Sequence, residues 1–340
     1  MIDNELVVGT VHDLRVPLNG IKGHIHYLRN YIDDETVTQE LNIIEKSCQS
    51  MEKLINTILD YSKLSQGSYI LDNREFSTKE LIDDIENQAR ANANIKGIEL
   101  VCSISGRVPE RLISDSFRLE MLIGNLVSNS FKFTQIGYIG VHVDCESVDE
   151  QHAMLEISVV DTGNGIDVDR ADTVFEAYSQ AGYAAKVLGG TGLGLYVIKQ
   201  FALLMGGDIV LDNRPGDGCA FKLKVMVGLI DGYQVNEGVA DESATAFINN
   251  IYALAKEQKK FGSVSNTAAL RKVIIKLREN LESKDVLAAE NDVASIKSLL
   301  AGSEENMKRL GLKLAMSVRS SDMRQALEIL KMIEEMYEKN

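Results

Sequence analysis

Apolar residues in the first part of the chain recur at alternating steps of four and three, the spacing of helices that bury one side. Two such stripes occur, one over Val7, Val11, Leu14, Leu18, Ile21, Ile25 and Leu28, and one over Leu41, Ile44, Cys48, Met51, Ile55 and Ile58. A short polar break separates them, so residues 1–66 are predicted to form an antiparallel helical hairpin. A lone hairpin buries its stripes poorly, which favours self-association into a four-helix bundle.

The pattern between residues 67 and 227 mixes short strands with helices. One helix, with a Ser or Thr cap, is predicted to begin within 76–81, and another is predicted to run over 118–133. Short runs rich in β-branched residues are predicted to be strands at 98–102, 139–145, 155–160, 207–213 and 219–227. This pattern predicts one mixed α and β domain, bounded at 70–227.

The remaining chain is predicted to be a linker over 228–242 and then helical over 243–340. Five helical patterns are visible, at 247–260, 270–281, 286–300, 307–318 and 323–337. Leu270, Ile274, Leu277 and Leu281 form one apolar stripe. An all-α module of this kind indicates an interaction or assembly role, and the pattern alone does not identify its chemistry.

Composition narrows the class of protein. The net charge of −14 argues against general nucleic-acid binding. Cys48, Cys102, Cys145 and Cys219 stand apart from one another, which predicts neither a metal site nor disulfides. No apolar run approaches the roughly 18 residues that span a bilayer, and the first residues lack a signal-peptide pattern. These features predict a cytoplasmic protein without a membrane segment.

One candidate nucleophile lies in the first helix. His12 falls beside the apolar stripe and is followed by Asp13, and Pro17 is expected to loosen the helix one turn later. A carboxylate that holds the Nδ1 proton makes the Nε2 nitrogen of a histidine more basic. A surface histidine beside a surface aspartate is the simpler explanation, and this stretch alone favours it.

The middle region holds the candidate pieces of a phosphate and purine site. Asn125, Asn129 and Lys132 share one side of a helix, where amide oxygens suit Mg²⁺ and an ammonium suits phosphate. Asp161 ends a strand before a turn with Gly163 and Gly165, where a carboxylate can accept a hydrogen bond from an amine such as that of adenine. Solvated or helix-capping asparagines and a plain β-turn are the alternatives.

A glycine-rich stretch followed at once by a helix completes the set. The glycines at 189, 190, 192 and 194 allow close approach of the backbone to a ligand, and the N-terminus of the helix favours phosphate. Lys186 is the one charged residue of the preceding segment and is placed to meet a phosphate. Such a stretch alone is weak evidence, since turns before helices often look alike.

These residues, in this order, resemble the catalytic core of the sensor histidine kinases of two-component systems. The matching stretches are 11–19 (H box), 125–134 (N), 161–166 (G1), 175–180 (F), 189–195 (G2) and 216–221 (G3). The resemblance covers about residues 5–227. It implies a dimeric helical hairpin that forms a four-helix bundle, followed by a GHKL-type α/β sandwich. With the all-α module predicted from the helical pattern after it, the fold class is α+β.

The resemblance also implies the role of each site residue. His12 is the phosphorylated residue, with Asp13 as its base partner. Asn129 ligates Mg²⁺, Asn125 and Lys132 assist around the phosphates, and Asp161 holds the adenine amine of ATP. Gly163 and Gly165 shape the pocket. The lid and phosphate contacts fall to a group from the G2 stretch: Gly190, Thr191, Gly192, Leu193 and Gly194.

The implied function is autophosphorylation of His12 by ATP and transfer of the phosphoryl group to an aspartate of a response-regulator receiver domain, in a homodimer formed through residues 1–66. Movement about a hinge near 66–70 is expected. Val16 stands where most members have Thr or Asn, so phosphatase activity toward the regulator is expected to be weak or absent. The chain begins near the H box, so it is either part of a longer sensor or receives its signal elsewhere.

Two other functions share features with this sequence. A catalytically weak docking module that binds regulators or other kinases is the main alternative, although Asn129, Asp161 and the G2 glycines are intact. A chaperone or topoisomerase type of GHKL ATPase would lack the hairpin with its H box. A histidine-phosphotransfer or receiver domain at the C-terminus is not expected, because no histidine follows His152 and the alternation of strands and helices is missing.

Overall fold

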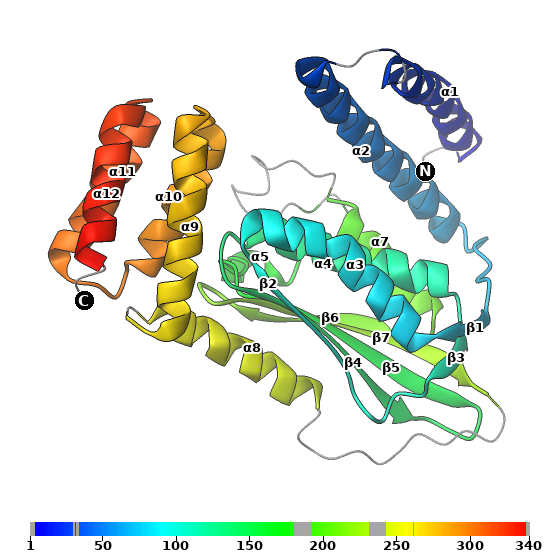
Figure 1. Cartoon of the computed structure of the whole chain (residues 1–340). Coiled ribbons are helices and arrows are strands. Elements are labelled where there is room, and N and C mark those ends of the chain that lie inside the picture. Colours follow the sequence, from blue (N-terminus) through cyan, green and yellow to red (C-terminus); the bar gives the residue numbers. More distant parts are fainter. Residues whose placement is uncertain are drawn as a thin grey trace. The chain divides into compact units, whose positions relative to one another are not determined.

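The computed structural model (Figure 1) describes residues 4–29, 31, 34–177, 179, 192–230, 243–260 and 262–337. The chain divides into two compact units. The first unit comprises residues 1–72 and 169–205, and the second comprises residues 73–168 and 206–340. The mixed fold of helices and one sheet agrees with the α+β class expected from the sequence.

The first unit contains the predicted hairpin of α1 (Asn4–Arg29) and α2 (Glu35–Ser65). Helix α1 continues through Pro17, and Asp34 caps α2 by accepting a hydrogen bond from the Val37 amide at 3.0 Å. The predicted stripes divide into two sets. Buried between the two helices are Leu18, Ile25, Leu41, Cys48 and Ile55. Left exposed are Leu14, Ile21, Leu28, Ile44 and Met51.

Helix α7 (Gly194–Leu204) packs against α2 within the same unit. The rings of Tyr61 and Tyr196 lie 5.5 Å apart, and Tyr69 meets Phe201 edge to face at 5.0 Å. Tyr69 belongs to the segment that sequence analysis expected to be a hinge. A short helix, α5 (Val168–Ala171), precedes α7 in the chain.

The second unit is built on a seven-stranded sheet with the order β1-β3-β7-β5-β4-β2, and β6 pairs with β7 beside this path. Only the β2–β4 pair is parallel among the pairs of the described strands. The strands are β1 (Arg74–Ser77), β2 (Glu99–Ile104), β3 (Arg111–Ser114), β4 (Tyr138–Ser147), β5 (His152–Asp161), β6 (Asp208–Arg214) and β7 (Gly218–Leu229).

Helices α3 (Thr78–Lys96) and α4 (Ser116–Phe133) lie on one face of this sheet (Figure 1). The interior positions of α4, Leu119, Leu122 and Leu126, are fully buried. Successive strand residues point to opposite faces, and Val159 and Val160 of β5 are both fully buried, so the sheet is covered on both faces. Helix α8 (Ala244–Lys259) packs on the second face of the sheet.

The predicted strands of this region are all present, and so is the helix predicted to begin within 76–81 with a Ser or Thr cap, whereas strands β1 and β3 were not predicted. Phe76 lies in β1 opposite Leu112 of β3, and Ser77 is the cap of α3, accepting a hydrogen bond from the Glu80 amide. Strand β7 continues to Leu229, into the residues assigned to a linker. Residues 231–242 of that predicted linker lie outside the described residues.

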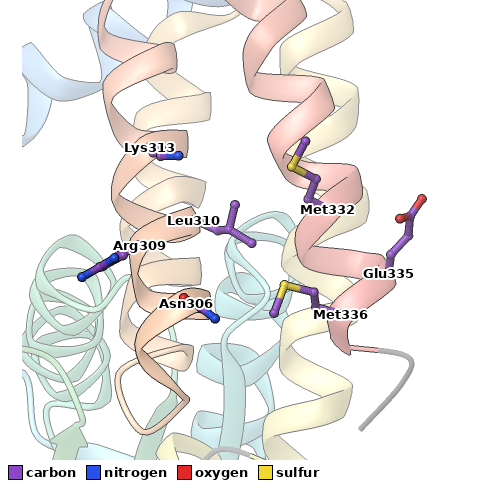
Figure 2. Close-up of a pocket in the computed structure, with 7 residues that line it drawn as sticks. All are labelled: Asn306, Arg309, Leu310, Lys313, Met332, Glu335 and Met336. Atoms are coloured by element: carbon purple, nitrogen blue, oxygen red, sulfur yellow. The ribbon is translucent and has the colours of Figure 1, made fainter.

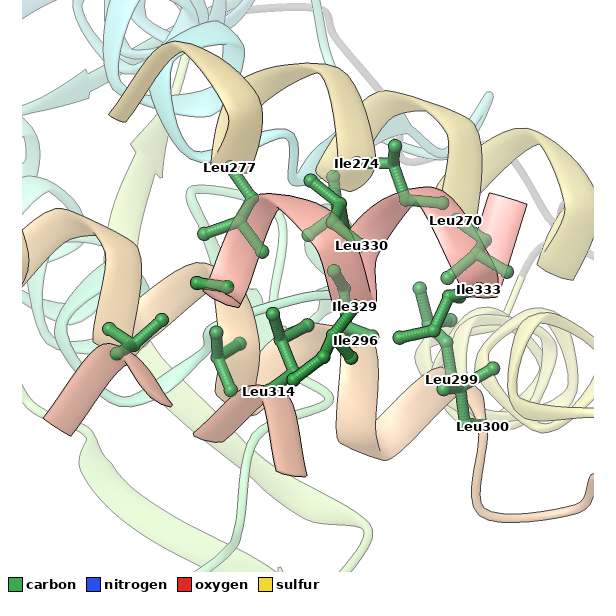
Figure 3. Close-up of a cluster of buried hydrophobic side chains, with 14 of the residues drawn as sticks. Leu270, Ile274, Leu277, Ile296, Leu299, Leu300, Leu314, Ile329, Leu330 and Ile333 are labelled. Carbon is green, nitrogen blue, oxygen red and sulfur yellow. The ribbon is translucent and has the colours of Figure 1, made fainter. Parts of the chain in front are cut away.

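The predicted all-helical region is confirmed among residues 243–337. After α8 come α9 (Val264–Glu282), α10 (Val286–Leu299), α11 (Glu305–Arg319) and α12 (Met323–Tyr337). Each of these four packs on its neighbour, and α12 packs back on α9, which closes a four-helix bundle. Figure 3 shows their common core, to which α9 contributes the predicted stripe of Leu270, Ile274, Leu277 and Leu281.

The bundle consists of two similar hairpins. Lys284 between α9 and α10 and Ser321 between α11 and α12 both have positive φ, 60° and 57°. The next residues, Asp285 and Asp322, each accept a hydrogen bond from the amide three residues later at 3.0 Å. The same turn and cap geometry therefore occurs in both hairpins.

Candidate active site

Helix α4 carries three of the predicted site residues on one side. Asp115 caps its first turn by accepting a hydrogen bond from the Arg118 amide at 3.0 Å. Asn125, Asn129 and Lys132 are half-buried and follow one another at helical spacing of four and three. Burial lowers the pKa of Lys132, whose ammonium lies 5.4 Å from the ring of Phe133. This side of α4 offers two amide oxygens and one cation.

Asp161 is the last residue of β5 and is paired with Ile139 of β4 and Cys219 of β7. It is 4% exposed. Burial raises the pKa of its carboxyl to about 6, against the opposing effect of backbone hydrogen bonds from Gly163 and Cys219. The Gly163 amide donates to Oδ1 at 3.0 Å. A buried acceptor with a perturbed pKa at a strand end is a candidate binding group.

The loop after Asp161 is shaped by its glycines. A Cβ on Gly163 would lie 2.6 Å from the carbonyl oxygen of Phe133, so only glycine lets this loop approach the end of α4. Gly165 has a φ of +70°, and a Cβ there would lie 2.8 Å from the carbonyl oxygen of Arg214. The loop therefore lies between the end of α4 and the turn that follows β6.

Hydrogen bonds join this loop to the turn. The Asn213 side chain accepts from the Ile166 amide at 2.9 Å and donates to the Ile166 carbonyl at 2.7 Å. The Gly216 amide donates to the Asn164 carbonyl at 2.8 Å. Sequence analysis did not single out Asn213. Its place just before a Pro-Gly turn is a weak signal, because such an asparagine commonly bonds its own turn instead.

Three of the predicted G2 residues are described, and all lie in the first unit. Gly192 has a φ of +70°, which favours glycine. Leu193 is 3% exposed and precedes α7, which begins at Gly194. Lys186, Gly190 and Thr191 lie outside the described residues. Asn129 and Asp161, by contrast, belong to the second unit.

His12 and Asp13 lie within helix α1, as predicted. The structure describes their backbone but not their side chains.

No cluster of three or more His, Cys, Asp or Glu side chains that could hold a metal ion occurs among the described residues. The described helices include none long and apolar enough to cross a membrane. Mg²⁺ commonly takes few protein ligands together with substrate phosphates. The half-buried amide of Asn129 fits that kind of site.

A pocket lies in the bundle, between α11 and α12 (Figure 2). It has a volume of about 470 Å³. Its lining consists of Asn306, Arg309, Leu310, Lys313, Met332, Glu335 and Met336. None of these is a predicted site residue, so this pocket does not form part of the candidate active site.

Two family models match the chain. Residues 3–67 match the His Kinase A (phospho-acceptor) domain. Residues 114–228 match the histidine kinase-, DNA gyrase B-, and HSP90-like ATPase family. The two matches do not overlap and follow the order of the predicted hairpin and sandwich.

Relatives and a solved structure agree with these matches. Sensor protein GacS of Pseudomonas syringae pv. syringae is 38% identical over 221 residues, covering 65% of this chain and 24% of GacS. Signal transduction histidine-protein kinase BarA of Escherichia coli (strain K12) is 33% identical over 229 residues, covering 67% of this chain and 25% of BarA. The chain thus spans about a quarter of the length of these relatives.

The crystal structure of full-length ShkA in complex with AMPPNP superposes with a TM-score of 0.56 at 23% identity. The superposition covers 68% of this chain and 47% of ShkA. This likeness concerns the fold.

Proposed function

We propose that this chain, which belongs to the sensor histidine kinases of two-component systems, is an ATP-dependent protein-histidine kinase that phosphorylates its own His12 and passes the phosphoryl group to an aspartate of a response-regulator receiver domain. One observation carries the proposal. The acceptor-domain match covers the part of α1 that contains His12, and the ATPase match covers Asp161, which ends β5 as a buried carboxyl.

The second unit supplies the adenine end of the ATP site in this proposal. The carboxylate of Asp161 accepts a hydrogen bond from the adenine amine, and Gly163 and Gly165 allow the loop to lie flat against its neighbours. Asn125 and Lys132 contact the phosphates from α4. Mg²⁺, held by Asn129 and the phosphates, would neutralise charge on the transferred group.

Residues of the G2 stretch complete the phosphate end of the site. Gly192, Leu193 and Gly194 lead into α7, whose N-terminus has no side-chain cap among the described residues and is suited to phosphate oxygens. Lys186, Gly190 and Thr191, outside the described residues, are assigned to the same end by the family pattern. ATP supplies a γ-phosphoryl group that is transferred in line.

The transfer step uses His12 and Asp13. The lone pair of the His12 Nε2 atom attacks the γ-phosphorus, and the bond from that phosphorus to the β,γ-bridging oxygen breaks, so ADP leaves with the electron pair. Asp13 accepts a hydrogen bond from Nδ1–H and so stabilises the positive charge that forms on the imidazole ring. The site therefore works by orientation and charge neutralisation.

The exposed half of the hairpin stripe supports a homodimer. Leu14 and Ile21 of α1 are each 44% exposed, and Met51 of α2 is 46% exposed. Leu14 and Ile21 are seven residues apart, as are Ile44 and Met51, which is the spacing expected of a surface that a second hairpin covers in a four-helix bundle. Location in the cytoplasm stays a prediction.

The alternative, a docking module with little catalysis, is tested with labelled ATP. The protein is incubated with Mg²⁺ and either γ-labelled or α-labelled ATP, and a receiver domain is then added. We expect label from γ-labelled ATP only, followed by its transfer to the receiver. Absence of both label and ATP binding would favour the docking module.

Val16 gives a further hypothesis about the same helix. A polar side chain at this position is implicated, by the family pattern, in positioning water for dephosphorylation of the regulator. The unaltered protein is expected to dephosphorylate a receiver slowly, and Val16→Thr to increase that rate. Rapid dephosphorylation by the unaltered protein would refute the hypothesis.

A further inference from the structure

Helix α8 packs on the sheet face opposite α3 and α4, directly behind the strand ends that carry the candidate site. Ile248, Ile251 and Tyr252 of α8 form a buried cluster with Val160 of β5 and Ala220 of β7. Val160 immediately precedes Asp161 in the chain. The first helix of the C-terminal module therefore covers the back of the adenine side of the site.

A glycine of the sheet permits this close packing. A Cβ on Gly140 of β4 would lie 2.7 Å from the ring of Phe247 and 3.0 Å from Ile251. Phe247 also stacks on His142 of β4, with ring centroids 4.9 Å apart. These contacts hold the first part of α8 on β4.

Residues in the middle of α8 contact the turn that follows β6. The guanidinium carbon of Arg214 lies 4.2 Å from the ring centroid of Tyr252, which is 3% exposed. An Arg214 nitrogen also donates to the Asn249 side chain at 3.2 Å. A cation–π contact contributes more when the ring is buried than when it is exposed to water.

A third contact reaches the tip of the turn. The Lys259 ammonium lies 3.5 Å from the Gly216 carbonyl oxygen, at the limit of a hydrogen bond. Gly216 in turn donates to the Asn164 carbonyl. An unbroken series of contacts thus runs from α8 through the turn to the loop that follows Asp161.

We propose that α8 is a positioning element of the nucleotide site, in which Tyr252, with Asn249 and Lys259, fixes the Arg214–Gly216 turn and, through it, the loop after Asp161. These α8 residues do not touch the nucleotide. The inference rests on the proposed function only in taking that loop as the adenine side of the ATP site.

The bundle is attached to the same helix. The Asn266 side chain, which is fully buried at the start of α9, donates to the Gln258 carbonyl at 2.9 Å and to the Leu299 carbonyl at 3.1 Å. Gln258 precedes Lys259. The four-helix bundle is therefore bonded to the end of α8 that contacts the turn. In this proposal the bundle thereby influences the affinity for ATP.

The test compares Tyr252→Leu, which removes the ring, with Tyr252→Phe, which keeps it, in the full chain. Phe247→Leu is the matched control, because Phe247 is an aromatic residue of α8 whose ring lies against Gly140 and His142 of β4, whereas Tyr252 contacts Arg214. ATP affinity is measured by direct binding, and KM and kcat by autophosphorylation, with thermal unfolding recorded for each variant.

We expect Tyr252→Leu to raise the Kd and KM for ATP about tenfold with little change in kcat, since couplings through packed residues are of this order. Tyr252→Phe should keep the unaltered affinity, and Phe247→Leu should lose thermal stability without losing affinity. Asn249→Ala, at an exposed position that leaves no cavity, should weaken ATP binding in the same sense by a smaller factor.

Unaltered ATP affinity in Tyr252→Leu would overturn the proposal. So would equal weakening by Phe247→Leu, because α8 would then support the sheet as a whole and not the turn. Direct binding separates this result from the kinase proposal: a chain that binds ATP but transfers no phosphoryl group contradicts the role of His12 and leaves the role of α8 testable.

Discussion

The guanidinium group of Arg214 lies over the ring of Tyr252, with 4.2 Å between its carbon and the ring centroid. Arg214 ends β6 and touches the loop after Asp161 through its backbone, whereas Tyr252 belongs to α8. This contact is one of several that join the sheet domain to the C-terminal helices. A shift of α8 would therefore move Arg214 and, through its backbone, the loop that follows Asp161.

Burial of Asp161 predicts pH-dependent ATP binding. In the folded protein the pKa of the Asp161 carboxyl is raised from 3.8 to about 6. The carboxyl is therefore protonated below that pH, where it is a weaker acceptor for the adenine amine. We expect ATP affinity to rise up to about tenfold as pH increases through about 6, since a charged acceptor strengthens a hydrogen bond by that order. Isothermal titration across this range measures it.

Asp161→Asn is the control, because the phosphates of ATP titrate in both proteins and the carboxyl in one. The variant should bind ATP weakly with a flatter pH profile. The same shift acts on folding: the raised pKa stabilises the folded state below 3.8, and this contribution is lost as pH rises through about 6. Identical pH profiles for both proteins would contradict the assignment.

Gly165 is predicted to be intolerant of a side chain. Gly165→Ala combines a φ of +70° with a Cβ 2.8 Å from the Arg214 carbonyl oxygen. Gly216→Ala has a φ of +85° but open space around its Cβ, so it should cost only backbone strain of about 1 kcal/mol. We expect Gly165→Ala to be less stable than Gly216→Ala in urea unfolding and to bind ATP more weakly. Equal behaviour would contradict the described loop geometry.

Ile21 is predicted to lie in the dimer interface. Ile21→Glu would place a charge among apolar side chains and should weaken dimerisation by more than tenfold, because unpaired charges are costly to bury. Ile43→Glu is the matched control, since Ile43 is 58% exposed and lies off the stripe. Sedimentation equilibrium distinguishes the two. Dimer dissociation by both variants, or by neither, would exclude the predicted surface.

Local patterns predicted most of the elements. The stripe through Leu18 and Ile25 predicts a helix whatever it packs against, and the apolar run ending in Val160 predicts a strand. Strand β1, which contains Phe76, was not predicted, because it has four residues and a single buried side chain and its identity depends on pairing with β3. Pairing between distant segments leaves little trace in a local pattern.

The candidate site follows the same rule. Asp161 was found because its neighbours form a recognisable turn in sequence. Tyr252 was not found, because its contact with Arg214 depends on how a later helix packs on the sheet. The division of the hairpin stripe, with Leu18 buried and Leu14 exposed, likewise depends on the pairing of α1 with α2.

The central claim is phosphorylation of His12, and the most direct measurement is incubation with γ-labelled ATP and Mg²⁺ for the unaltered protein, His12→Gln and His24→Gln. His24 lies on the same helix and is exposed. We expect an acid-labile, alkali-stable label in the unaltered protein and in His24→Gln, and none in His12→Gln. Label of that stability retained in His12→Gln would contradict the account.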